Sequence, residues 1–409
     1  MPNDARTPVV VVAGLAAAAA KDVADALLDE RTAVVHHDVA QLCDGVLIRR
    51  IRCGADDCTT ARRLAHGCVS CFLREELLPL LRSLATSADL DRIVLHLDPT
   101  MEPETVCWAV EHLKVAGDPL PDLIKVQAVV TVLDAGNWLA DATSDQAPID
   151  RLLSAGLDED RTLAQLVVGQ VEFADAIIVA GAAADLDTAR RTDAVLDRLV
   201  PMAPRVQATR LDVEALLAAV PANSRRGRVD DAHAALTHHT HPWHTEHGVG
   251  TVLFGARRPF HPERLHDAVQ ILLQGVVRVR GRMWIATQPD QALAVESAGG
   301  DLRVARAGRW LGALPDWSNI NIERALMASL RWDDQFEDRE QALLVIYHAA
   351  DPEVIVATLD AALITDTELA AGQQQWQTWS DPFGHFHADP CVPTEPAEAK
   401  DNGRRRGPS

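Results

Sequence analysis

The fold class is decided by one stretch near the start of the chain, Pro8-Val9-Val10-Val11-Val12-Ala13-Gly14-Leu15-Ala16-Ala17-Ala18-Ala19-Ala20-Lys21-Asp22. Its valines predict a buried strand over residues 8–12, because β-branched side chains favour extended backbone. Gly14 interrupts that strand, and the alanines after it are strong helix formers. We therefore expect a helix over residues 16–28. A buried strand that turns directly into a helix is typical of an α/β domain.

Three further apolar runs continue the same pattern, with helical patterns between them: residues 92–95, 129–133 and 176–179. Strands that alternate with helices predict βαβ units. Such units form a mainly parallel sheet with helices on both faces. The first half of the chain is therefore expected to be α/β.

The composition narrows the class of protein. The chain has 409 residues, 47% of them hydrophobic, which suggests two or three domains. Its net charge of −20 disfavours broad binding to nucleic acid or to anionic membrane. We find no apolar run of about 18 residues and no signal-peptide pattern at the start. The seven cysteines, an odd number, fit a reducing cytoplasm better than a disulfide framework.

A change of composition near residue 221 divides the chain. We expect an α/β domain over residues 1–220 and a polar, histidine-rich linker over residues 221–247. Residues 248–390 mix short strands with helical stretches and predict a smaller α+β domain. The arginine-containing end, residues 391–409, predicts a disordered tail.

The turn after the first strand occupies the place of a phosphate-binding loop, G-x-x-x-x-G-K-[ST]. Gly14 matches the first glycine, but the second glycine is missing and Lys21 comes one residue late. Asp22 stands where a magnesium-binding hydroxyl belongs, and its carboxylate would oppose phosphate charge. These three residues are the candidate nucleotide-binding set. The alternative is an ordinary strand-to-helix turn with a surface lysine.

A candidate metal site lies in the stretch His66–Cys71, where two cysteines stand two residues apart behind a glycine. A soft divalent metal binds thiolates, and this spacing lets Cys68 and Cys71 reach one ion. Zinc prefers four ligands, so two more are needed. The candidates for them are close in sequence: His66, Cys53 and Cys58. The alternative is a pair of structural thiols at the start of the leucine-rich helix that follows.

The linker contains a second set of possible zinc ligands: His238, His239, His241 and His244. Neutral imidazoles on such a segment can capture zinc. A solvated linker that is merely rich in histidine is the alternative.

Arginines alternate along a predicted strand of the second domain, at Arg278, Arg280 and Arg282. Alternate residues of a strand share one face. A basic face on an acidic protein predicts a surface for an acidic protein or for phosphate backbones. The alternative is a solvated face paired with local carboxylates.

Several segments carry a resemblance to one known family. Its GCxCC signature is matched at residues 67–71 with Ser70 in place of one cysteine, and its VVTVVDA strand is matched at residues 129–135. Residues 170–178 look like its QIEFADVI segment, and residues 255–265 look like its RRPFHPERL segment. The chain thus resembles the CobW-type zinc-chaperone GTPases. The resemblance implies a P-loop-GTPase-like sheet followed by the smaller CobW C-terminal domain, with zinc as the metal.

The nucleotide motifs of that family are altered in this chain. The acidic ExxG turn aligns with His96–Pro99, and Ala180–Ala183 occupies the place of the guanine-reading NKxD motif. Neither Asp185 nor Asp193 has the spacing to substitute. Because phosphoryl transfer depends on positioning by these elements, we predict weak or absent GTP hydrolysis on a conserved fold.

The pattern of altered motifs most resembles an actinobacterial branch of the family that is associated with zinc starvation. That resemblance implies a zinc-responsive adaptor that recruits a hibernation factor to the small ribosomal subunit, mainly through protein contacts with some local rRNA contact. A zinc metallochaperone GTPase that delivers metal to a client protein is the alternative. A zinc buffer that acts through its histidines is the third possibility.

Overall fold

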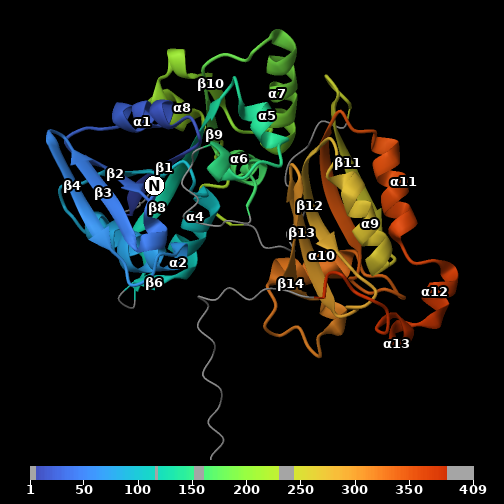
Figure 1. Ribbon diagram of the computed structural model, residues 1–409. Coiled ribbons are helices and arrows are strands. Elements are labelled where there is room, and N and C mark those ends of the chain that lie inside the picture. The colour runs from blue at the N-terminus through green and yellow to red at the C-terminus, as the bar shows by residue number, and fades with distance from the viewer. Residues whose placement is uncertain (1–5, 116–117, 152–160, 230–243, 385–409) are drawn as a thin grey trace, which may run out of the picture.

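The computed structural model describes residues 6–115, 118–151, 161–229 and 244–384. These residues form two large sheets, each with its own helices, which lie side by side in Figure 1, and one small two-stranded sheet. The first sheet has the strand order β10-β9-β8-β1-β5-β2-β3-β4. The strands from β10 to β2 run parallel, whereas β3 and β4 form an antiparallel hairpin at one edge.

The strands of the first sheet are β1 (Thr7–Ala13), β2 (Thr32–Asp38), β3 (Val46–Cys53), β4 (Asp56–Arg63), β5 (Arg92–His96), β8 (Ile124–Asp134), β9 (Ala176–Ala180) and β10 (Arg205–Gln207). The helices around it are α1 (Ala17–Ala26), α2 (Val69–Cys71), α3 (Leu78–Ala85), α4 (Pro103–His112), α5 (Trp138–Ala142), α6 (Leu163–Glu172), α7 (Leu186–Leu199) and α8 (Val213–Ala219). Shorter elements are the 3-10 turns η1 (Leu42–Asp44), η3 (Leu120–Asp122), η4 (Pro148–Arg151) and η5 (Ala208–Arg210), the π-helical turn η2 (Phe72–Leu77), and the small hairpin of β6 (Lys114–Val115) and β7 (Asp118–Pro119).

Helices cover both faces of this sheet, as the apolar strands require. On one face α1 and α8 pack against side chains such as Val10 and Val130. On the other face η2, α3 and α4 pack against Val9, Val11 and Leu95. The alternation of valines along β1 between these two clusters explains why a continuous apolar run marks the strand. The predicted α/β class with helices on both faces is confirmed, with the edge hairpin as an addition.

The second sheet is antiparallel, in the order β11-β15-β12-β13-β14. Its strands are β11 (Val249–Ala256), β12 (Val276–Met283), β13 (Gln291–Ala298), β14 (Asp301–Arg309) and β15 (Gln341–His348). Its helices are α9 (Pro262–Leu272), α10 (Ile322–Leu330), α11 (Pro352–Ala362), α12 (Asp366–Ala371) and α13 (Gln373–Trp376), with the turn η6 (Leu311–Ala313). This is the α+β arrangement that the sequence predicts.

The two units share a continuous apolar contact. In Figure 1, α9 and α11 cover the face of the second sheet that points away from the first unit. Its other face contributes Val277, Ala298 and Ile346 to a cluster that contains residues of α6 and α7. Burial of these side chains fixes the second sheet against the helices beside β9. No helix of the described residues combines the length and apolar character needed to cross a bilayer.

Candidate functional site

The turn between β1 and α1 is too short for a phosphate-binding loop. Only Gly14, Leu15 and Ala16 separate the strand from the helix. The backbone of Gly14 has φ +126°, and a Cβ at this position would overlap the carbonyl oxygen of Val132. Here glycine lets β1 pass close to β8, whereas a nucleotide-binding loop needs a longer glycine-rich segment to wrap around phosphates.

Lys21 is paired with its own helix. Its Nζ lies 2.6 Å from Oδ2 of Asp25, one helical turn on, and Asp25 also pairs with Arg52 on β3. Asp22 is exposed beside it. The ammonium group is thus partly neutralised, and the structure does not bring the three candidate nucleotide residues together around one point.

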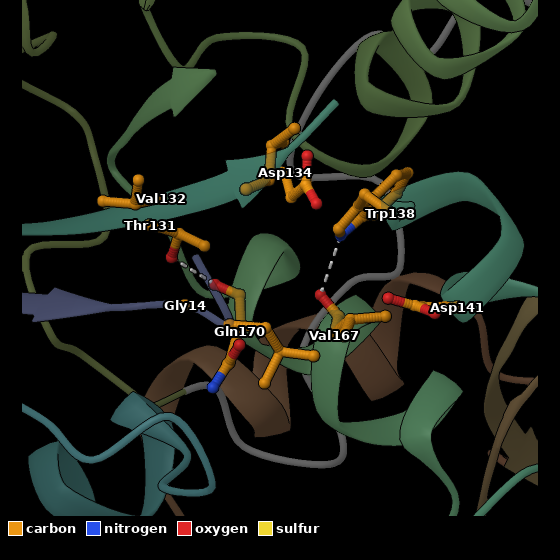
Figure 2. A pocket seen from close by; sticks show the side chains of 10 residues that line it. Gly14, Thr131, Val132, Asp134, Trp138, Asp141, Val167 and Gln170 are labelled. Carbon is orange, nitrogen blue, oxygen red and sulfur yellow. Dashed lines mark hydrogen bonds between the residues drawn. The ribbon is translucent and has the colours of Figure 1, made fainter. Parts of the chain in front are cut away.

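A hollow lies at the carboxyl ends of β1 and β8, where α/β folds usually bind ligands. Asp134, Trp138, Asp141 and Gln170 are among the residues that line it (Figure 2). Neither lysine nor arginine is among the described residues that line it, whereas two carboxylates are. Its cavity volume is about 20 Å³, which has room for little more than one water molecule. Asp141 is paired with Arg151, so Asp134 is the carboxylate that would oppose phosphate charge. A triphosphate would also find little room here.

The polar groups of this hollow are occupied by internal hydrogen bonds. Thr131 Oγ1 donates to the carbonyl oxygen of Gln170 over 2.7 Å, and Trp138 Nε1 donates to that of Val167 over 3.4 Å (Figure 2). The amide of Gln170 donates to the carbonyls of Pro99 and Met101. The walls are therefore built for packing.

His96, the first residue of the altered ExxG turn, stacks on a second histidine. The rings of His36 on β2 and His96 on β5 lie 4.6 Å apart, and Nδ1 of His36 donates to the carbonyl oxygen of His96 over 3.0 Å. Burial, reinforced by His36, lowers the pKa of His96 to about 4, so the ring is neutral near pH 7. Asp98 accepts from the backbone N–H and the hydroxyl of Thr100. Its carboxylate thus stabilises the turn.

The place of the guanine-reading motif also lacks a suitable side chain. After β9 the chain turns at Gly181, which has φ +71°. Asp185 caps α7 by accepting from the backbone N–H of Thr188 over 2.7 Å. Asp193 is exposed on that helix. The Asp185 carboxylate is thus used as a helix cap.

The two cysteines of the candidate metal site share one turn. Cys68 precedes α2, and its Sγ lies 3.4 Å from the backbone nitrogen of Cys71. Gly67 lies so close to η1 that a Cβ would overlap the carbonyl oxygens of Leu42 and Cys43. It is the backbone of Cys43 that adjoins Gly67, a contact that no short motif in the sequence predicts. Both thiols of the pair are partly exposed.

The proposed third ligands are not gathered around this turn. His66 is exposed. Cys53 and Cys58 lie near the tip of the β3–β4 hairpin, because Cys53 pairs with Asp56, whereas the Arg63 end leads to the cysteine turn. The rise of about 3.3 Å per residue separates them from that end by roughly 15–25 Å. Within the described ranges no three His, Cys, Asp or Glu side chains are grouped to hold a metal ion.

A buried carboxylate links the cysteine helix to the sheet, and no sequence pattern predicts it. Glu76 lies in η2, immediately after the cysteines, with its side chain 2.8 Å from Arg49 Nη1 and 2.9 Å from Arg62 Nε. His37 is 3.6 Å away. Burial opposes ionisation, but the hydrogen bonds and positive charges outweigh it and lower the pKa of Glu76 to about 2. A local motif cannot reveal such a group, because its partners come from three different strands.

Most of the histidine linker lies outside the described residues, including His238, His239 and His241. His244 is described, and it is exposed on the approach to β11. Its carbonyl oxygen accepts from Nη2 of Arg198 over 2.6 Å, and its ring lies 3.7 Å from Glu246. No further ligand joins it in the described part of the chain.

The arginine face on β12 differs from the expectation. Arg278 and Arg282 are buried, and Arg280 is half-buried. Arg278 and Arg280 each lie 2.7 Å from Glu172 at the end of α6, while Arg282 lies 3.0 Å from Glu340. The three arginines do alternate along the strand. Their side chains point into the molecule, where carboxylates from other elements neutralise their charges. These arginines join parts of this chain and do not form an exposed partner surface.

Comparison with known proteins places the chain in a family. The model described as "CobW/HypB/UreG, nucleotide-binding domain" matches residues 20–207, and "Cobalamin synthesis protein cobW C-terminal domain" matches residues 249–363. The first match begins beyond the turn at Gly14. Together with the relatives below, these matches show that the chain belongs to the CobW family.

Among the relatives is "Zinc chaperone Rv0106" of Mycobacterium tuberculosis, 43% identical over 94% of this chain and 95% of that protein. "Zinc-regulated GTPase metalloprotein activator 1" of Dictyostelium discoideum is 26% identical over 78% of this chain and 69% of that protein. The crystal structure of Zn(II)-bound YjiA GTPase from E. coli aligns with 88% of this chain and 99% of that chain at 15% identity and a TM-score of 0.36, and adds nothing to the family assignment. The names of the Mycobacterium tuberculosis and Dictyostelium discoideum relatives agree with the expectation that zinc is the family's metal.

Proposed function

We propose that this protein is a cytoplasmic zinc metallochaperone that accepts zinc at Cys68 and Cys71 and passes it on without a GTPase cycle. The observation that carries the proposal is the incomplete ligand set: two partly exposed thiols in one turn, with no third ligand grouped beside them among the described residues. Closed four-ligand sites retain zinc, whereas a site with open positions can exchange it with another protein.

The absence of a nucleotide requirement follows from the first turn. Between β1 and α1 the described chain has no room for a phosphate loop, and Lys21 is paired with Asp25. The nearby hollow presents Asp134, and neither lysine nor arginine is among the described residues that line it. We therefore expect zinc transfer to depend on thiolate chemistry and on the partner's ligands, which compete for the ion.

Zinc binding can be tested by competition with a chromophoric zinc chelator. The double variant Cys68→Ser/Cys71→Ser is expected to bind zinc at least tenfold more weakly than the unaltered chain, because hydroxyls replace both thiolates. Cys58→Ser is the matched control, since Cys58 is exposed on the distant hairpin. Equal affinity of the double variant and the control would show that zinc binds elsewhere, and a further variant without residues 233–247 would then locate it.

The nucleotide part of the proposal needs a separate titration with fluorescent GTP. We expect no binding at micromolar protein and no change of zinc affinity when GTP is added. Micromolar binding with turnover would favour a metallochaperone that works as a GTPase. It would contradict the inference that the turn between β1 and α1 cannot hold phosphates.

A second candidate is the zinc-responsive adaptor that recruits a hibernation factor to the small ribosomal subunit. The observation that favours it is the loss of all three nucleotide motifs from a chain in which both family domains are kept, as suits a scaffold without catalysis. Sedimentation through sucrose at low and high zinc tests it. Co-migration with ribosomes that depends on zinc supports the adaptor, and its absence at both concentrations leaves the metallochaperone.

A further inference from the structure

Helix α10 turns its large aliphatic side chains to solvent, whereas an ordinary surface helix buries them. Ile322, Leu326 and Leu330 follow one another at intervals of four residues and are 81%, 59% and 72% exposed. The small residues Ala325 and Ala328 are less exposed. A surface helix normally buries its large aliphatic side chains, so α10 presents an apolar ridge to solvent.

The ridge is held in a fixed position. Asn321 caps the helix by accepting from the backbone N–H of Glu323 over 2.7 Å. Nη2 of Arg324, on the opposite side of the helix, donates to the carbonyl oxygen of Arg309 at the end of β14 over 2.6 Å. Figure 1 shows α10 beside this edge of the second sheet. The exposed side chains are therefore part of an anchored element.

The apolar surface continues past the end of the helix. Met327 and Trp332 are about two-fifths exposed. The indole of Trp332 lies against that of Trp317, with ring centroids 5.6 Å apart. We call Ile322, Leu326, Met327, Leu330 and Trp332 the α10 patch. Contiguous exposed apolar side chains on an anchored element are typical of an interaction site.

Charges beside the patch indicate which partner fits. Three exposed carboxylates adjoin it in sequence, Asp316, Glu323 and Asp334. The nearby Arg331 is paired with Glu340 over 2.9 Å. Arg331 shares Glu340 with Arg282, and Arg324 is half-buried against the carbonyl oxygen of Arg309. The three exposed carboxylates therefore leave the border with an acidic excess, in a chain of net charge −20. A basic partner complements it, whereas a second copy would bring like charges together.

We propose that the α10 patch binds a basic amphipathic helix of a partner protein. Ridges of side chains spaced four residues apart pack into the grooves of another helix, and lysines beside that helix's apolar stripe would meet the acidic border. A helix of this length covers far less than the roughly 800 Å² per partner of a standard interface. A short helical segment is therefore a better fit than a large globular surface.

Hydrogen exchange of the full chain with defined peptides tests the proposal. The probe is a leucine–lysine peptide with a helical repeat. Its comparison peptides are a scrambled version and a leucine–glutamate version of the same pattern. We expect the helical leucine–lysine peptide alone to slow exchange in residues 320–334. No local protection, or equal protection by the acidic or scrambled peptide, would overturn the proposal.

Substitutions distinguish specific binding at the α10 patch from nonspecific hydrophobic binding elsewhere on the chain. Leu326→Ser/Leu330→Ser is expected to weaken peptide binding at least about tenfold, because two exposed leucines lose their contacts. Leu253→Ser is the matched control, since Leu253 is 48% exposed on β11 of the same domain, and its affinity should be unchanged. Equal weakening in both variants contradicts the proposal. So does a dimer, detected by sedimentation, that the double substitution abolishes.

Discussion

Gly14 is a position where the backbone itself excludes every other residue. Its φ of +126° lies outside the range that side chains tolerate, and an added Cβ would overlap the carbonyl oxygen of Val132 on β8. Two separate costs therefore oppose substitution: local strain and the displacement of a central strand. A sequence motif suggested a phosphate contact for this glycine, whereas the structure assigns it to strand packing.

We predict that Gly14→Ala lowers the free energy of unfolding by more than the roughly 1–3 kcal/mol of backbone strain alone. Gly372→Ala is the control, because Gly372 has φ +79° but nothing within 4 Å of an added Cβ. It should lose only the roughly 1–3 kcal/mol of backbone strain, because its φ of 79° and ψ of 169° lie in a region that glycine alone adopts readily. Urea unfolding of both variants measures the difference. Equal losses would mean that the contact with Val132 relaxes freely.

At the scale of elements, the helix that follows the cysteines contains a π-helical turn, Phe72–Leu77. Such turns are rare and occur often at functional sites. Here the turn contains Glu76, which joins the helix to His37 on β2, Arg49 on β3 and Arg62 on β4. This link couples the cysteine turn to the edge hairpin.

We predict that Glu76→Gln destabilises the chain by about 1–3 kcal/mol, because the charge-assisted hydrogen bonds of the buried carboxylate to the partly exposed Arg49 and Arg62 are weakened. Glu75→Gln is the neighbouring control. Glu75 is exposed and accepts from the backbone N–H of Ala65, and a glutamine oxygen can still accept, so its effect should stay within about 0.5 kcal/mol. Thermal unfolding at neutral pH compares them. A loss at Glu76 no larger than at Glu75 would rule out the link.

Elements with a clear apolar pattern were predictable, and those without one were not. The valine run gave β1, and similar runs gave β5, β8 and β9. The edge strand β4 was not predicted, because it is exposed almost throughout and lacks an alternation of apolar and polar residues. Helix α10 shows why pattern alone misleads: its four-residue spacing of aliphatics normally marks a buried face, yet the structure turns that face outward.

The candidate sites were predictable only where their residues are neighbours in sequence. Cys68 and Cys71 do share a turn. The contact of Gly67 with Cys43, and the pairing of Arg278 with Glu172, join residues far apart in the chain. Tertiary contacts of this kind leave no local pattern. The arginine alternation therefore predicted a shared face correctly and its exposure wrongly.

At the scale of the whole molecule, the two domains are joined by a charged contact at the end of an apolar one. Glu172 receives Arg278 and Arg280, each at 2.7 Å, and Arg278 also lies 3.5 Å from Glu296. Val277 beside them belongs to the apolar cluster shared with α6 and α7. Because the partners of Glu172 come from the second sheet, its ionisation stabilises the domain arrangement as well as the fold.

The pH dependence of this contact follows from the pKa of Glu172. Burial would raise that pKa, but the charges of Arg278 and Arg280 outweigh burial and lower it from 4.5 to about 2. A carboxylate with a lowered folded-state pKa stabilises the protein fully above its unfolded pKa. The stabilisation, about 3 kcal/mol for such a shift, is lost as the pH falls from about 4.5 towards 2.

We predict that Glu172→Gln removes this part of the acid dependence and loosens the domain contact at neutral pH. Hydrogen exchange should become faster in β12 and in the last turn of α6, while β1 stays protected. Glu296→Gln is the matched control, because Glu296 is 61% exposed and more distant from Arg278, so its exchange should match that of the unaltered chain. If Glu172→Gln exchanged like the control and kept the same loss of stability between pH 4.5 and 2, the apolar cluster alone would hold the two domains together.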